Sequence, residues 1–174
     1  MRSENNKANL NVSLEYHCPR YSELPKIPLY KEQVINYIEE VLSVLTYNKE
    51  ETILTPTMLN NYVKQKVLFP PENKKYNRDH LAYLIVICIL KHVLSISEIS
   101  ELIDLQMEKY SLEYAYDCFC VELENSIDEI FKSKEARKEE FENIDIKEVK
   151  LIRASVLSVV NKAYVQKILN EKIH

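Results

Sequence analysis

The amino-acid sequence predicts a mainly α protein, and three observations support this fold class. Apolar residues recur at spacings of three and four in several segments, which is the period of an amphipathic helix. Typical capping residues stand directly before such segments: a Thr-Pro pair, an Asn and a Ser-x-x-Glu motif. The 174 residues include no glycine, so tight hairpins lose their preferred residue. The length suits one domain, or one domain with a helical appendage.

The first elements are predicted from proline positions and apolar spacing. Residues 1–18 begin as a polar, Asn-rich stretch, and we expect a flexible N-terminal segment. Three prolines follow within ten residues and predict an extended lead-in. Apolar positions over 31–45 have helical spacing and predict the first amphipathic helix. Residues 46–52 are polar and predict a loop.

The second helix has a clear start and a clear end in the sequence. Thr55 is the expected N-cap and Pro56 the first helical residue. We place this helix at about residues 56–66, because Phe69-Pro70-Pro71 cannot continue it. Residues 72–76 then predict a short, basic and exposed connection.

The third helix is expected to be the central one. Asn77 is its predicted cap, and residues 78–93 form its body, with a middle that is apolar on all sides. A capping box at Ser95 and Glu98 predicts a short helix that ends near residue 104. Residues 19–104 together are the expected first domain, which the family resemblance given below implies to be a helix-turn-helix domain.

Residues 105–174 predict a helical C-terminal region, a possible dimerisation or effector module. We expect long helices at 105–132 and 145–171, with a charged loop or helical extension over 134–142 between them. A heptad-like stripe in the last helix is either a homodimer seam or the face that packs on its own chain: Val149, Ile152, Val156, Val159 and Ala163. Aromatic residues of this region either line a pocket for a small-molecule effector or belong to the core: Tyr110, Tyr114, Tyr116, Phe119 and Tyr164.

Charge is distributed unevenly along the chain. The net charge is −4, yet residues 64–91 carry +4 and residues 98–150 carry −9. A basic segment beside an acidic one indicates one face for a polyanion and another face for a different role. The alternative is that both segments are simply solvated helix faces.

Several function classes are not expected. Without glycine the chain cannot build a Walker loop or a dinucleotide fingerprint. The four histidines have no Ser or Cys partner at a catalytic spacing, and the four cysteines lack zinc spacing. We therefore expect no enzyme, no cofactor and no metal, and we interpret the cysteines as reduced thiols of a cytoplasmic protein. The most apolar run, residues 81–90, is too short to span a membrane.

Two family resemblances cover the N-terminal half. The run Thr55-Pro56-Thr57-Met58-Leu59-Asn60-Asn61-Tyr62 and its exit through Pro70-Pro71 resemble the recognition helix of MerR-type winged helix-turn-helix regulators. Residues 76–84 and 91–99 resemble the passage from the wing into the third and fourth helices of that family, so the likeness spans about 53–103. It implies a MerR-like winged helix-turn-helix core. Where that family has a glycine after the recognition helix and Gly-Tyr-Arg in the wing, this chain has Val67 and Lys74-Lys75-Tyr76, so we expect a short or degenerate wing.

The second resemblance is closer and spans about residues 19–105. The lead-in Arg20-Tyr21-Ser22-Glu23-Leu24-Pro25 through Tyr30, and the run Leu54-Thr55-Pro56-Thr57-Met58 through Lys64, resemble an uncharacterised bacterial family known as a domain of unknown function. This resemblance implies a regulator without an established activity.

The residue pattern and the resemblances together predict a sequence-specific DNA-binding transcriptional regulator. A major-groove helix needs short polar side chains on its exposed turns and an apolar face behind them. The candidate DNA-binding residues on the helix are Thr55, Thr57, Asn60, Asn61 and Lys64. Lys74, Lys75 and Arg78 are expected to contact the phosphates of the DNA backbone. The expected partners are double-stranded DNA and a second copy of the chain. The alternative is a protein-interaction module that keeps the fold and does not bind DNA.

Overall fold

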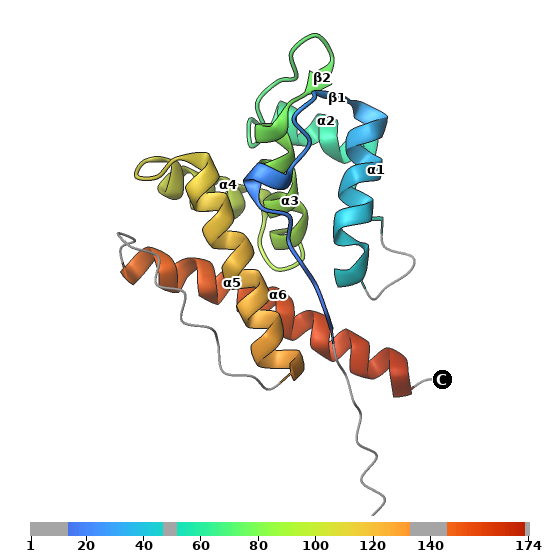
Figure 1. The fold of residues 1–174 in the computed structure, drawn as a ribbon, viewed down its shortest axis with the longest axis vertical. Helices are drawn as coiled ribbons and strands as arrows, with labels where there is room; N and C mark the ends of the chain where they lie inside the picture. The colour runs from blue at the N-terminus through green and yellow to red at the C-terminus, as the bar shows by residue number, and fades with distance from the viewer. Residues whose placement is uncertain (1–13, 47–51, 133–145, 173–174) are drawn as a thin grey trace, which may run out of the picture.

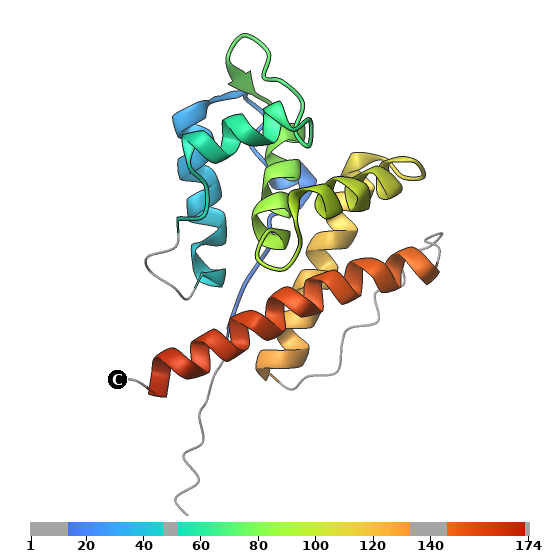
Figure 2. The same ribbon diagram turned by 180° about the vertical axis from the view of Figure 1, so that it is seen from behind.

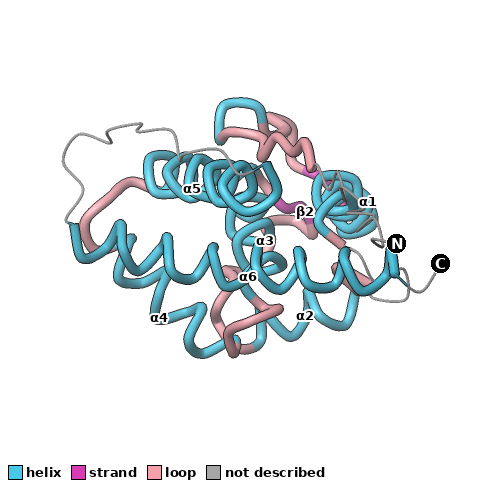
Figure 3. Tube along the Cα trace, turned by 90° about the horizontal axis from the view of Figure 1, so that it is seen from below, coloured by secondary structure: helices cyan, strands magenta, loops and turns pink. Residues whose placement is uncertain are grey.

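The computed structural model describes residues 14–46, 52–132 and 146–172. Most of the described chain is helix, and strand is confined to one short antiparallel pairing (Figure 3). The mainly α fold class is therefore confirmed. The charged segment 134–142 and the first thirteen residues of the predicted flexible segment lie outside the described residues. The rest of that segment is described, and its Leu14 and Cys18 are buried in the core.

The elements follow in a simple order. The helices are α1 (Lys31–Leu42), α2 (Pro56–Lys64), α3 (Arg78–Leu90), α4 (Ile96–Met107), α5 (Leu112–Lys132) and α6 (Ile146–Lys172). Short 3-10 turns η1 (Tyr21–Glu23) and η2 (Ser43–Leu45) precede and follow α1. Strands β1 (Leu29–Tyr30) and β2 (Lys75–Tyr76) pair, with Leu29 opposite Tyr76.

Three predicted helix starts are confirmed by cap hydrogen bonds. The Thr55 hydroxyl accepts from the Met58 backbone N–H at 3.1 Å, with a proline at the first position of α2. The Asn77 side chain accepts from the His80 N–H at 3.2 Å at the start of α3. At the start of α4, the Ser95 hydroxyl accepts a hydrogen bond from the Glu98 N–H. The Glu98 carboxylate accepts one from the Ser95 N–H at 2.7 Å. Each cap satisfies backbone donors that a helix leaves without an internal partner.

Several predicted helix ends are corrected. The first two helices end at Leu42 and Lys64 rather than near residues 45 and 66, and the third ends at Leu90 rather than at residue 93. The fourth helix continues to Met107 rather than ending near residue 104, and the long helix expected over 105–132 begins at Leu112, after a turn at 108–111. The Ser111 hydroxyl accepts from the Tyr114 N–H at 3.4 Å, which gives α5 a start of its own.

The central position of α3 is confirmed. This helix packs against α1, β2, α4, α5 and α6, and its side chains are buried on every side. The strand pair and α2 lie at one end of the molecule, and α6 crosses the opposite end (Figures 1 and 2). Burying one Leu or Ile side chain stabilises a fold by roughly 1.5–3 kcal/mol, so the Leu and Ile side chains of α3 contribute strongly to core stability.

The heptad-like stripe of α6 packs within its own chain. Ile152, Val156, Val159 and Ala163 are all buried and belong to the single core cluster. This favours the second of the two interpretations, in which the stripe is a core face. A homodimer, which remains a prediction, would have to form through another surface.

The extended lead-in is attached to α5 by polar contacts. The Tyr116 hydroxyl donates to the Pro19 carbonyl at 2.8 Å, and the Tyr21 N–H donates to the Asp117 carboxylate at 2.7 Å. The Arg20 guanidinium donates one hydrogen bond to each carboxylate oxygen of Glu124, at 2.8 and 2.7 Å. Segments about one hundred residues apart in the sequence are thereby held side by side.

The glycine-free chain builds its tight turns with other residues. Lys66 has φ 60° after α2, where the Val67 N–H bonds the Tyr62 carbonyl and the Lys66 N–H bonds the Val63 carbonyl. These two bonds define a Schellman motif, whose left-handed position is normally glycine. Asn73 and Lys74 have φ 50° and 63°, the pair of positive values that a type I′ hairpin turn requires.

We expect Lys66→Gly to raise the free energy of unfolding by about 1 kcal/mol, because glycine enters the left-handed region without a Cβ clash. Urea unfolding followed by circular dichroism measures the change. The matched control is Lys64→Gly, which lies inside α2 and should lower the free energy of unfolding by about 1 kcal/mol. Equal effects from the two variants would contradict the assignment of Lys66 as the cap position.

No helix among the described residues is long and apolar enough to cross a membrane.

Candidate functional site

The second helix has one buried side and one polar side. Leu59 and Tyr62 are buried and attach α2 to the core. The opposite side carries Thr57, Asn60, Asn61 and Lys64, all exposed, at positions i, i+3, i+4 and i+7. That spacing places the four side chains on one helical face, which we call the polar face of α2. The predicted candidates on this helix, apart from Thr55, are thus brought together.

Beside α2 lies a short hairpin. Glu72 and Lys75 exchange backbone hydrogen bonds of 3.1 and 2.8 Å across the Asn73-Lys74 turn, and Lys75 continues into β2, which pairs with β1. This corrects the expectation that tight hairpins are disfavoured here, since Asn and Lys supply the two positive φ angles. The short basic connection predicted at residues 72–76 therefore folds as a two-residue hairpin.

The polar face and the hairpin border a common groove of about 810 Å³. Its cationic and amide groups come from three elements: Lys31 from α1, Asn60 from α2 and Lys74 from the hairpin turn. The Lys31 ammonium donates to the Asn60 amide oxygen at 2.8 Å. The groove is lined by Tyr30, Lys31, Glu32, Gln33, Asn60, Val63, Pro71, Lys74 and Tyr76.

The remaining predicted site residues take other positions. The Thr55 hydroxyl is used as the cap of α2. Lys75 is half-buried, and its ammonium lies 5.0 Å from the centre of the Tyr30 ring. The Arg78 guanidinium lies 5.2 Å from the centre of the Tyr21 ring, and its Nε is buried. Arg78 is therefore directed toward the lead-in and does not line the groove.

Sequence reasoning missed Lys31. A cation at the first position of a helix opposes the helix dipole, so its presence at the start of α1 is locally unfavourable. That unfavourable placement was the available signal for a role outside the helix itself. In the fold, Lys31 and Lys74 line the groove beside Asn60, whereas the predicted Arg78 does not.

The groove presents hydrogen-bond donors and positive charge. Lys31 and Lys74 supply ammonium groups, the amides of Gln33 and Asn60 supply paired donors and acceptors, and Glu32 supplies one carboxylate. Asn61 and Lys64 lie on the polar face of α2 and do not line the groove. Such groups bind phosphate oxygens and the edges of bases. In the described part of the chain, no group of three or more His, Cys, Asp or Glu side chains is placed to hold a metal ion.

The histidine nearest the hairpin has a structural role. His80 is buried, its Nδ1 accepts from the Asn77 N–H at 3.0 Å, and its Nε2 donates to the Pro70 carbonyl at 3.3 Å. The Asn77 side-chain oxygen lies 2.7 Å from the same Nδ1, so the ring and the cap residue contact each other reciprocally. Burial lowers the pKa of His80, although the carbonyls of Pro70 and Phe69 act in the opposite direction.

We expect stability to fall between pH 7.5 and pH 5.5. The folded pKa of His80 lies below the unfolded value of 6.5, so the unfolded chain binds more protons as pH falls through 6.5. The loss is on the order of 1 kcal/mol. Urea unfolding at both pH values measures it, and His80→Gln is the comparison, because Gln keeps the reciprocal cap without titrating. An unchanged pH dependence in His80→Gln would contradict this assignment.

The aromatic residues of the C-terminal region do not form one cluster. Tyr116 and Phe119 line a small cavity between helices, whereas Tyr110 packs against Tyr114, with ring centres 5.8 Å apart. Tyr164 packs on the Phe131 ring. Of the five aromatic residues that either line an effector pocket or belong to the core, only Tyr116 and Phe119 line this cavity.

The four cysteines are unbridged and buried. Burial raises the pKa of the Cys88 and Cys118 thiols to about 12. Because the thiolate is the reactive form, these side chains act as small core residues.

Comparison with known proteins places the chain in a family. Neither the curated proteins nor the solved structures contain a match to this sequence. The model of one family, described as "Domain of unknown function (DUF1836)", matches residues 19–119. That range runs from the lead-in through α2, the hairpin and α3 to the part of α5 that holds Tyr116 and Asp117. The chain is therefore a member of the DUF1836 family.

Proposed function

We propose that this protein binds double-stranded DNA in a sequence-specific manner and regulates transcription. The observation that carries the proposal is the polar face of α2, with its short hydroxyl and amide side chains and a terminal lysine. An α-helix fits the major groove, where Asn pairs with adenine and Thr contacts thymine methyl groups or phosphates. Leu59 and Tyr62 hold the opposite side of the helix on the core.

The elements around α2 support a winged helix-turn-helix arrangement. The order is β1, α1, α2, a two-residue hairpin and α3, and the hairpin strand β2 pairs with β1. This is consistent with the resemblance to MerR-type regulators. In our proposal Lys31, Lys74 and Lys75 contact phosphates, and the N-terminus of α2 faces a phosphate as well.

The acidic part of the chain lies mostly away from the hairpin. The C-terminal part of the acidic helix α5 lies toward the far end of the molecule from the hairpin (Figures 1 and 2). The acidic helix α4 is nearer, since its Asp104 lines a shallow pocket together with Lys64 at the end of α2. The separation of Lys31 and Lys74 from α5 reduces the effect of the unfavourable net charge of −4 at the groove.

The test is fluorescence-anisotropy binding to a library of genomic DNA fragments over a range of salt concentrations. We expect Lys74→Ala to weaken binding on all fragments and to reduce the salt slope by about 1. Asn60→Ala should cost about 1–3 kcal/mol on the preferred fragment and relax the preference at one base pair.

Matched controls lie on α6. Lys150→Ala removes an exposed lysine and Asn161→Ala removes an exposed amide, and both should bind DNA like the wild type. If Lys74→Ala and Lys150→Ala weaken binding equally, or if no fragment is preferred over random DNA, the proposal is wrong.

A protein-interaction module is the second candidate function, and one observation favours it. Ile27 is 77% exposed and Tyr30 is 54% exposed, and both lie in the segment that leads into α1 beside the groove. Exposed apolar side chains of this size are typical of protein contacts. Absence of salt-dependent DNA binding, together with an unchanged fold, would favour this candidate.

A further inference from the structure

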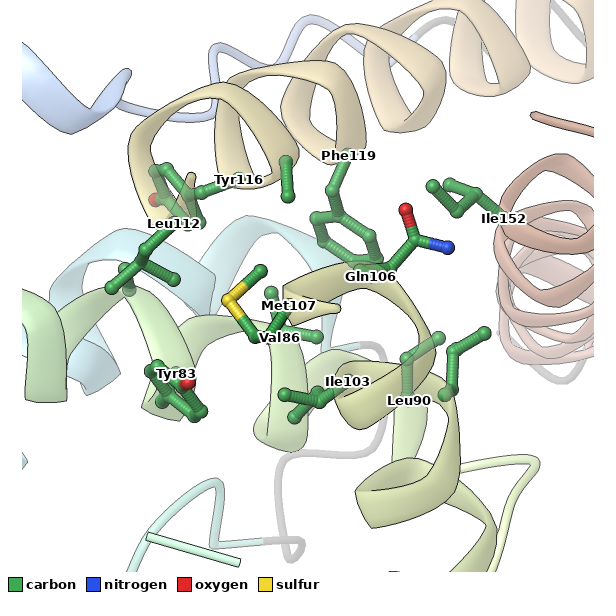
Figure 4. Close-up of a pocket in the computed structure, with 13 residues that line it drawn as sticks. Tyr83, Val86, Leu90, Ile103, Gln106, Met107, Leu112, Tyr116, Phe119 and Ile152 are labelled. Carbon is green, nitrogen blue, oxygen red and sulfur yellow. The ribbon is translucent and has the colours of Figure 1, made fainter. Parts of the chain in front are cut away.

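A small cavity lies where α3, α4, α5 and α6 meet (Figure 4). Its volume is about 50 Å³, whereas one water molecule needs about 10–15 Å³ on such a measure. The walls are almost wholly apolar, with Val86 and Leu90 from α3, Ile103 and Met107 from α4, and Phe119 from α5. Ile152 of α6 closes one side.

One polar side chain interrupts this apolar wall. Gln106 is 7% exposed, and its amide nitrogen has no hydrogen-bond partner among the described residues. Figure 4 shows the amide between the Phe119 ring and Ile152. A buried amide nitrogen carries two donors, and leaving both unpaired is unfavourable unless another molecule accepts them.

Two tyrosines also line the cavity. The Tyr116 hydroxyl donates to the Pro19 carbonyl at 2.8 Å, outside the cavity, and Tyr83 of α3 contributes a second hydroxyl to the wall (Figure 4). The recognition chemistry of the cavity is therefore the amide of Gln106, with the Tyr83 hydroxyl as a further polar group, in a wall that is otherwise hydrocarbon and the Met107 thioether. Small-molecule sites commonly combine an apolar wall with one or two placed polar groups.

We infer that this cavity binds a small carbonyl compound, with its alkyl part against Val86, Met107 and Phe119 and its oxygen accepting from the Gln106 amide. A carbonyl oxygen satisfies the unpaired donor, and a short alkyl chain suits the apolar wall. The cavity is open to solvent on one side, so a ligand larger than about 50 Å³ extends beyond it. This inference does not depend on DNA binding, because the polar face of α2 contributes no residue to the cavity.

The experiment uses the full chain with ¹³C-labelled Met and Ile methyl groups. The probes are 2-butanone and 2-methyl-1-butene, which replaces the carbonyl oxygen by a methylene group and keeps the shape. We expect 2-butanone to shift the methyl signals of Met107, Ile103 and Ile152 along a saturating curve. The signal of Ile38, which lies in α1 and does not line the cavity, should stay unchanged.

The variant that isolates the amide is Gln106→Met, and its matched control is Gln65→Met on the exposed C-cap of α2. We expect Gln106→Met to weaken 2-butanone binding about fivefold or more, which is the effect of losing one hydrogen bond. It should bind 2-methyl-1-butene at least as well as the wild type. Gln65→Met should leave both affinities unchanged.

Two results would overturn the inference. The first is a linear, non-saturating shift of the Met107 methyl with both probes. The second is equal 2-butanone affinity in the wild type, Gln106→Met and a second variant, Gln106→Leu. Methyl spectra of the free variants establish that each is folded before titration.

Discussion

Glu124→Leu should lower the free energy of unfolding by about 3 kcal/mol, because it leaves a partly buried guanidinium without its carboxylate. The Glu124 carboxylate accepts two hydrogen bonds from Arg20 and one from the Cys18 N–H at 2.9 Å. The Arg20 and Glu124 side chains are 26% and 23% exposed, so water replaces these bonds incompletely. The measurement is urea unfolding at pH 7, with amide hydrogen exchange at Cys18 and Tyr21.

The pH dependence of this contact provides an independent check. Burial by itself raises the pKa of Glu124, but the hydrogen bonds from Arg20 and Cys18 outweigh it and leave the pKa below its usual value of 4.5. A lowered folded pKa gives stability that is present above about 4.5 and is lost as pH falls. Glu124→Leu should therefore lose less stability than the wild type between pH 5 and pH 3.

Glu101→Gln is the matched control, since Glu101 is exposed on α4. It should change the free energy of unfolding by no more than about 0.5 kcal/mol. Unchanged stability and unchanged exchange in Glu124→Leu would show that the lead-in is not held on α5 as described.

Leu59→Ala should cost about 3 kcal/mol of stability, because it opens a cavity beneath α2. Leu59 is fully buried, whereas Asn61, two residues further along the helix, is exposed. Asn61→Ala should change stability by no more than about 0.5 kcal/mol. Urea unfolding of the two variants measures which side of α2 faces the core.

The same pair of variants separates folding from binding. Asn61→Ala keeps the fold and, in our proposal, loses affinity for the preferred DNA fragment. Leu59→Ala, measured at a temperature where it remains folded, keeps the polar face of α2 and should lose less discrimination between fragments. Equal stability of the two variants would contradict the orientation of α2.

Sequence reasoning predicted helix starts better than helix ends. Thr55, Asn77 and Ser95 are caps because a short polar side chain can bond a backbone N–H two or three residues ahead. That contact is local, so it is visible in the sequence. The break between α4 and α5 was predicted too early, near residue 104 instead of at 108–111, because the apolar spacing continues through this stretch and tertiary packing decides where the turn forms.

The candidate site was predicted in part. The polar face of α2 follows from helical spacing alone, so Thr57, Asn60, Asn61 and Lys64 were found together. Lys31 and Arg78 could not be assigned in this way, because the partners of both side chains come from distant segments. The Arg78 guanidinium lies over the Tyr21 ring, and the Lys31 ammonium bonds the Asn60 amide oxygen, only after the chain has folded.

The sequence by itself determined the helical class, the capped helix starts and the two sides of α2, since these depend on residues within a few positions of one another. Tertiary structure decided which elements meet: the lead-in on α5, the stripe of α6 inside the core, and the amide of Gln106 in an apolar cavity. These contacts join segments far apart in the chain, and their free energies depend on burial and on partners that no local pattern specifies.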